Sequence, residues 1–113
     1  MNNQAGNQLY EFTVKAMRGA ECELPEGALG AYIPCYVFAL DYQTALKKGA
    51  TTLKDMGYLF DSVQGKVREI PPASWSSYVA KVWPDFADQL PSTDELPLLM
   101  KKGAIFFGPF ITF

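Results

Sequence analysis

The chain has 113 residues, of which 49% are hydrophobic and 19% charged, and its formal net charge is −2. This length suits one domain, and this composition excludes a disordered chain. The chain has no histidine, which excludes histidine general bases, Ser-His-Asp triads and nearly all catalytic zinc sites. The slight acidic excess argues against a nucleic-acid-binding surface, because neutralisation of phosphates supplies much of the affinity of such surfaces.

The chain is expected to form a single domain over residues 1–113, with residues 1–8 as a flexible N-terminus. Those eight residues are polar and carry no charged side chain, so they lack both the basic and the apolar segments of a secretory signal. The longest apolar stretch, residues 32–40, contains Pro34 and is too short to cross a bilayer. We therefore expect a cytoplasmic protein without membrane association.

The first third of the chain predicts two strands separated by an acidic loop. Residues 10–17 alternate between apolar and polar, which indicates a half-buried strand. Residues 18–31 contain three glycines, a proline and three glutamates, which predicts a loop. Residues 32–40 are apolar on both faces and predict a central strand covered on both sides. Regular pairing is expected to begin after Pro34, because proline has no N–H to donate.

The middle of the chain predicts a helix and a hairpin. Asp41 is placed as an N-cap, and apolar residues then recur at helical spacing until Gly57, a residue suited to a left-handed helix end. Gly49 lies within this helix, where it allows close approach to the sheet. Residues 58–63 and 66–70 predict two short strands, joined by a turn at residues 64–65.

The last third predicts two helices and a strand. An amphipathic helix ends at Pro84, and its apolar face consists of Trp75, Tyr78, Val79, Val82 and Trp83. Residues 84–92 form an acidic loop. Ser92 and Glu95 match a capping box that opens a short helix through about residue 102, with Gly103 at its end. Residues 104–113 predict a final strand, interrupted at residues 108–109 by a Gly-Pro pair.

From residue 32 onward, the expected order is strand, helix, two strands, helix, short helix and strand. With the segments VFALDYQTAL (37–46) and LKDMGYLF (53–60), this order resembles ferredoxin-like α+β modules. The resemblance implies an antiparallel sheet with two main helices packed on one face, to which the strand at 10–17 is an extra N-terminal addition. In size, acidity and lack of catalytic motifs, the chain is also similar to small immunity proteins of bacterial toxin–immunity systems. That similarity implies a cytoplasmic inhibitor of a toxin domain.

These observations favour a non-enzymatic protein whose partner is another protein, with a homodimer as a further form. We expect no cofactor, no metal and no catalytic residue. The side chains expected to contact a partner lie in the two acidic loops and on the central strand. They are Glu21, Glu23, Glu26, Asp85, Asp88, Asp94, Glu95, Tyr36 and Phe38. Acidic loops of this kind would steer a basic partner, and exposed aromatic side chains would anchor it.

The aromatic face of the central strand leaves three alternatives open. The N-terminal segment of the chain covers it, a protein partner or second copy buries it, or it stacks RNA bases. An RNA-binding module would draw charge from Lys66 and Arg68, although their segment does not match the RNP1 pattern. The other alternative is a small enzyme or small-molecule-binding domain that uses carboxylates, a tyrosine or Cys22.

The two cysteines provide a direct test of the compartment. Cys22 lies between two glutamates and Cys35 in an apolar run, and the spacing of the two matches no metal or redox motif. We expect both to be free thiols, as in a cytoplasmic protein. Titration of the protein, unfolded without reductant, should count two thiols. A count of zero would contradict the free-thiol prediction and weaken the cytoplasmic assignment.

Overall fold

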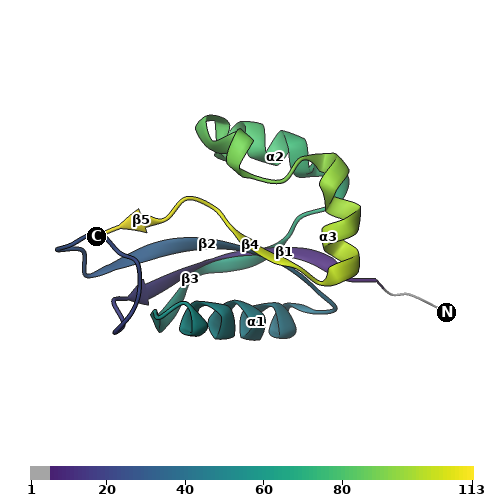
Figure 1. The fold of residues 1–113 in the computed structure, drawn as a ribbon. Coiled ribbons are helices and arrows are strands. Elements are labelled where there is room, and N and C mark those ends of the chain that lie inside the picture. Colours follow the sequence, from purple (N-terminus) through teal and green to yellow (C-terminus); the bar gives the residue numbers. More distant parts are fainter. Residues whose placement is uncertain (1–5) are drawn as a thin grey trace.

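The computed structural model describes residues 6–113, which form an open five-stranded antiparallel sheet with helices on both faces (Figure 1). The strands are β1 (Gln8–Met17), β2 (Gly30–Ala39), β3 (Leu59–Glu69), β4 (Ile105–Phe107) and β5 (Ile111–Thr112). Their order is β3-β1-β2-β4, and β5 pairs with the start of β2. The expected α+β class with an antiparallel sheet is confirmed.

Strand β2 is buried on both faces and supplies side chains to two cores. Cys35, Val37 and Ala39 belong to one core, and Tyr36 and Phe38 belong to the other. All five are at most 1% exposed. Because successive side chains of a strand point to opposite faces, this burial requires a layer on each side of the sheet. The prediction of a doubly covered central strand is confirmed.

Helix α1 (Tyr42–Asp55) covers the first face. The Asp41 side chain caps it by accepting a 2.7 Å hydrogen bond from the Thr44 backbone N–H, as predicted. Ala45 and Leu53 are buried in the first core together with Phe12. A Cβ added to Gly49 would lie 2.8 Å from the Phe12 ring, so this glycine permits the close contact of helix and sheet.

Strand β3 is continuous, so the hairpin predicted at residues 64–65 is wrong. Arg68 pairs with Glu11 and Gln64 with Thr13, which leaves residues 65–67 opposite the single residue Phe12. Gly65 adopts φ +74° within this bulge, a conformation that glycine reaches without strain. The Gln-Gly pair makes a bulge because the ten-residue strand β1 pairs with both halves of the segment.

A helical arm, residues 72–102, covers part of the second face. It contains α2 (Trp75–Val82), α3 (Leu96–Lys102) and the short 3₁₀ helices η1 (Pro72–Ser74), η2 (Pro84–Gln89) and η3 (Thr93–Glu95). Its buried residues Trp75, Val79, Leu90 and Leu96 pack with Leu9, Tyr36 and Phe38. The capping box at residues 92–95 and the left-handed Gly103 are both confirmed, whereas residues 84–89 are helical where a loop was predicted.

The final strand is interrupted at residues 108–109, as predicted, and its two parts pair with β2 around Pro34. The backbone of β2 pairs from Gly30 onward, including Pro34 opposite Thr13, so the expectation that pairing begins only after Pro34 is wrong. Pro34 O accepts a 2.9 Å hydrogen bond from the Gly108 N–H. The backbone nitrogen of Pro34, which has no hydrogen to donate, therefore points toward the break between β4 and β5. The hydrogen-bond ladder between β2 and its neighbours is interrupted there in any case.

The helices lie on opposite faces of the sheet (Figure 1), and not on one face as the ferredoxin-like resemblance implied. One helical layer cannot cover a strand that is apolar on both sides. β2, α1 and β3 form a split β-α-β unit with β1 between its strands. The arm then crosses the other face, from β3 at one edge to β4 at the opposite edge.

The described N-terminal residues belong to the fold. The Asn7 side-chain amide donates to Met100 O at 2.8 Å, and β1 begins at Gln8. Both lie within residues 1–8, the segment predicted to be a flexible N-terminus, and residues 1–5 of that segment lie outside the described part. Within residues 6–113, no helix is both long enough and apolar enough to cross a bilayer.

One buried hydroxyl in the second core, that of Tyr36, forms hydrogen bonds with two aromatic residues of the arm. Tyr36 Oη lies 2.8 Å from the Tyr78 hydroxyl and accepts a 2.6 Å hydrogen bond from Trp83 Nε1. Tyr36→Phe removes both bonds and should lower the free energy of unfolding by roughly 1–2 kcal/mol, because the Tyr78 hydroxyl and the Trp83 indole N–H each lose a hydrogen-bond partner in a partly buried site.

Urea denaturation measures this difference, with Tyr32→Phe on the same strand as the matched control. Tyr32 is half-buried beside Phe113, and its variant should stay within about 0.5 kcal/mol of the original chain. Equal effects of the two substitutions would show that the hydrogen bonds to Tyr36 contribute nothing specific.

Candidate functional site

The acidic loop between β1 and β2 is folded around the Arg18 side chain. The guanidinium donates to the carbonyls of Ala28 and Pro25, and the Arg18 backbone N–H donates to Leu29 O at 2.8 Å. Leu24 is 9% exposed and packs into the first core. This framework leaves three carboxylates exposed at the surface of the loop, those of Glu21, Glu23 and Glu26. All three are therefore accessible from solvent.

This loop packs against the turn that follows α1. A Cβ on Gly57, whose φ is +93°, would lie 2.8 Å from Cys22 N, so only glycine fits between the two segments. Glu21, Glu23, Met56 and Tyr58 line a hollow of about 270 Å³ at this junction. Two of the predicted acidic residues therefore border a concave surface that also contains apolar and aromatic groups.

Apolar side chains are exposed at the same end of the sheet. Strand pairing brings Met17 beside both Leu59 and Gly30, and Phe113 N–H donates to Gly30 O at 3.1 Å. We call this end the loop-end surface. It consists of Glu21, Glu23 and Glu26 with six apolar residues, Leu29, Met56, Leu59, Phe60, Ile111 and Phe113. These six are between 38% and 66% exposed, and they include more than half of the large apolar side chains that residues 6–113 expose.

Sequence reasoning found the acidic part of the loop-end surface but missed the apolar part. The sequence pattern predicts Leu29 in the acidic loop, and Ile111 and Phe113 in the final strand. The structure exposes them because β5 is a two-residue edge strand beside the start of β2. No local signal separates an exposed edge residue from a buried one in such a short apolar segment, since the difference depends on long-range pairing.

The second group of predicted acidic residues lies on the helical arm. Asp85 and Asp88 are in η2, and Asp94 and Glu95 are in η3. All four are exposed, but the Glu95 carboxylate accepts from the Ser92 N–H at 2.9 Å and serves the capping box. The arm and the β1–β2 loop are at separate places in the molecule (Figure 1), so the structure does not join the two acidic groups into one site.

The two aromatic residues predicted to contact a partner are inaccessible. Tyr36 and Phe38 are both 0% exposed beneath the helical arm. Tyr36 stacks on Phe106 with ring centroids 5.3 Å apart and meets Trp75 edge-on at 5.4 Å. Burial raises the pKa of the Tyr36 hydroxyl well above its usual value. The arm, and neither the N-terminal segment nor a partner, therefore covers this part of the aromatic face.

Titratable groups on the sheet have shifted pKa values that are explained by packing. Burial raises the pKa of the Glu11 carboxyl, and Arg68 on the adjacent strand partly opposes this effect. Burial also raises the pKa of the Cys35 thiol to about 12. Cys22 and Cys35 are both free, as predicted. Among residues 6–113, no group of three or more metal-ligating side chains is placed to hold a metal ion.

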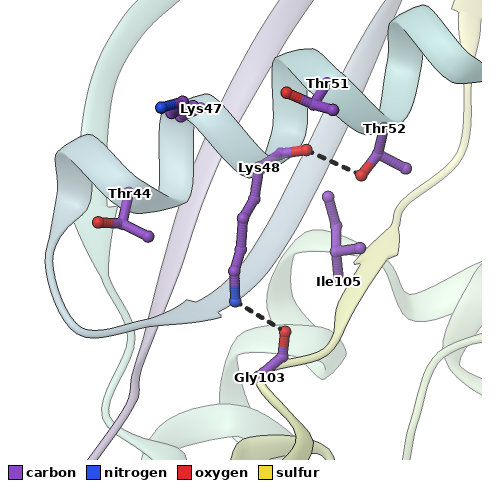
Figure 2. Close-up of a pocket in the computed structure, with 7 residues that line it drawn as sticks. All are labelled: Thr44, Lys47, Lys48, Thr51, Thr52, Gly103 and Ile105. Atoms are coloured by element: carbon purple, nitrogen blue, oxygen red, sulfur yellow. Dashed lines mark hydrogen bonds between the residues drawn. The ribbon is translucent and has the colours of Figure 1, made fainter.

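A separate groove lies between α1 and β4 (Figure 2), with a volume of about 430 Å³. It is lined by Thr44, Lys47, Lys48, Thr51, Thr52, Gly103 and Ile105. The Lys48 ammonium donates to Gly103 O at 3.0 Å and to Phe38 O at 3.1 Å, which fixes its position at one end of the groove. No local sequence pattern indicates this groove, because its residues come from segments about 55 positions apart.

Comparison with known proteins adds no assignment: no family model, curated protein or solved structure matches the chain.

The burial of the two thiols predicts a large difference in their reactivity. Cys22 is half-buried, whereas Cys35 is fully buried and has the raised pKa given above. Because the thiolate is the reactive species, a disulfide reagent at pH 8 should modify one thiol of the folded protein and two of the unfolded protein. A Cys22→Ser variant should show none when folded, and rapid reaction of this variant would contradict the burial of Cys35.

Proposed function

We propose that the chain is a non-enzymatic protein-binding protein whose partner docks on the loop-end surface. The observation that supports this function best is the presence of six exposed apolar side chains and three exposed glutamates at one end of the sheet. A partner would bury the apolar groups, which supply affinity by leaving water, while the glutamates would attract a basic rim.

The charges and the apolar groups would have different roles in binding. Carboxylates that remain in solvent act over a distance and raise the rate of encounter. Apolar side chains act only in contact, so they determine how long the complex persists. Leu29 and Ile111 are the strongest candidates for anchors here, because they are 66% and 53% exposed. Both lie at the C-terminal segment: the Leu29 N–H donates to Phe113 O, and Ile111 pairs with Tyr32.

The resemblance to small immunity proteins gives this proposal its most specific form. In that form, the partner is a bacterial toxin domain with a basic surface, and the chain neutralises it in the cytoplasm. The test begins with identification of the captured partner by mass spectrometry. Expression of that partner alone should arrest bacterial growth, and co-expression of the chain should restore it. Growth arrest that the chain does not relieve would overturn the immunity form while leaving protein binding intact.

The alternatives receive less support. Base stacking by an RNA-binding module would need Tyr36 and Phe38 at the surface, and both are covered by the arm. An enzyme would be favoured by a carboxylate of raised pKa within a cavity. Glu11 has the raised pKa, but it pairs across the strands with Arg68, and none of the cavities described above includes it.

Charge-reversal variants test which group of acidic residues, that of the β1–β2 loop or that of the arm, attracts the partner. In Glu21→Lys/Glu23→Lys/Glu26→Lys, association with the identified partner should slow by about tenfold at low salt, with little change in dissociation. The matched control is Asp85→Lys/Asp88→Lys/Asp94→Lys on the arm, which should associate at the original rate. Stopped-flow kinetics at two salt concentrations measure both. A slower arm variant with an unchanged loop variant would move the interface to the arm.

Truncation of an apolar side chain tests the anchors. Leu29→Ala and Ile111→Ala should each raise the dissociation rate by about tenfold, as expected when a central contact of an interface is lost. Leu98→Ala on the arm is the control, because Leu98 is 58% exposed but distant in the fold from the β5 pairing. Unchanged dissociation in both loop-end variants would contradict the proposed docking surface.

A further inference from the structure

The geometry of the groove between α1 and β4 points to a second binding surface. We propose that it takes an extended acidic peptide segment of a partner protein, which adds as a strand to the free edge of β4. This surface differs from the loop-end surface in both location and charge, and it does not depend on the function proposed above.

The free edge of β4 presents unpaired backbone groups. Phe38 N–H donates to Ala104 O and Gly108 N–H donates to Pro34 O, both at 2.9 Å. The C=O of Ala104 and the N–H of Gly108 therefore face β2. In an antiparallel pair, alternate residues point their N–H and C=O in opposite directions. Ile105 and Phe107 therefore turn theirs away from β2, where the strand order places no further strand among residues 6–113. An incoming strand would find two donors and two acceptors in regular register.

The opposite edge of the sheet is less suited to strand addition. Strand β3 has two register irregularities, one opposite Phe12 and one between Lys15 and Ala16. Its exposed residues include Gly65, with a positive φ, and the charged Lys66. Bulges and charged side chains are among the features that protect an edge strand from pairing. The pairing of β4 with β2 contains no such shift.

The groove lies where alternate side chains of an added strand would point. Ile105 packs toward the α1 face and lines the groove. Its other wall is formed by α1 residues one helical turn apart, Thr44, Lys47, Lys48 and Thr51 (Figure 2). Threonine methyl groups and lysine methylenes give this wall an apolar character. A volume of about 430 Å³ is ample for one or two medium apolar side chains.

The charges around the groove favour an acidic segment. Lys47 and Lys48 line it, and Lys101 and Lys102 immediately precede Gly103, which forms its end. These are four of the ten basic residues of a chain whose net charge is −2. The Lys48 ammonium has three N–H groups, two of which bond to carbonyls. Its third N–H remains for a carboxylate. Main-chain pairing would supply affinity, and the lysines would select acidic side chains.

The test uses a synthetic probe, the acetylated and amidated pentapeptide Glu-Val-Asp-Val-Glu, with Lys-Val-Lys-Val-Lys as its charge-reversed control. NMR of the full ¹⁵N-labelled chain should show saturable shifts at the Ile105 and Phe107 amides with the acidic peptide only. Their hydrogen exchange should slow by about tenfold at saturation, since a new backbone bond protects them. Higher salt should weaken the complex.

Two sets of variants separate the backbone contribution from the charges. Ile105→Pro removes one outward N–H, and Ile105→Ala keeps it, so the proline variant should bind about tenfold more weakly than the alanine variant. Lys47→Glu/Lys101→Glu should weaken binding about tenfold, whereas Lys66→Glu on the β3 edge should not. Thermal unfolding confirms that each variant is folded before its affinity is compared.

Several results would overturn the proposal. They are no saturable binding of the acidic peptide, equal binding of the basic peptide, or shifts confined to residues outside the groove. Equal affinities for Ile105→Pro and Ile105→Ala would exclude strand addition. If the Ile105 and Phe107 amides are already protected without peptide, and the chain sediments as a dimer, a second copy occupies the edge and the peptide proposal is wrong.

Discussion

The backbone of β2 pairs with β1 on one side and with β4 and β5 on the other, while its side chains enter a core on each face. Six side chains of β2 are each at most 1% exposed: Ile33, Cys35, Tyr36, Val37, Phe38 and Ala39. A strand buried in this way requires a helical layer above and below it, because exposed Tyr36 and Phe38 would leave a large apolar surface in water. The placement of α1 and the arm on opposite faces follows from this requirement.

The two layers cover the sheet to different extents, and this difference determines which surfaces are available for binding. The arm covers the second face over Tyr36 and Phe38 but leaves the end near β5 open (Figure 1). Acidic residues gather beside that open end, whereas lysines gather around the groove near Gly103. A small chain with nearly balanced charge therefore places three glutamates beside one surface and four lysines around the other. Each region lies next to apolar groups that are able to contribute affinity.

Sequence patterns predicted the elements well where local chemistry determines them. The cap at Asp41, the helical spacing that follows, the capping box at Ser92 and the left-handed Gly103 all act within a few residues. Prediction failed where one local pattern suits two structures. Gln64-Gly65 is compatible with a hairpin turn or a bulge, and only the length of β1 decides between them.

The candidate surfaces could be predicted only in part, for a related reason. Charge is visible in a sequence, so Glu21, Glu23 and Glu26 were found and are exposed. Exposure of apolar groups depends on which segments meet. Tyr36 and Phe38 were expected to contact a partner but lie under the arm, whereas Leu29 and Ile111 are exposed at an edge. The groove beside β4 requires α1 and Gly103 to come together, and no local pattern records that contact.

The distribution of aromatic residues makes the two cores separately visible by spectroscopy. Trp75 and Trp83 both belong to the arm and its core, while the core under α1 contains no tryptophan among the described residues. Intrinsic tryptophan emission therefore follows the undocking of the arm, whereas far-UV dichroism reports all helices and strands of the chain together. The segment from β1 to β3 is also complete before the arm is synthesised, so the first core is able to form early on the ribosome. The second core needs residues 70–106, because its buried side chains include Ile70, Trp75, Val79, Leu90 and Leu96, and Phe106 packs against them.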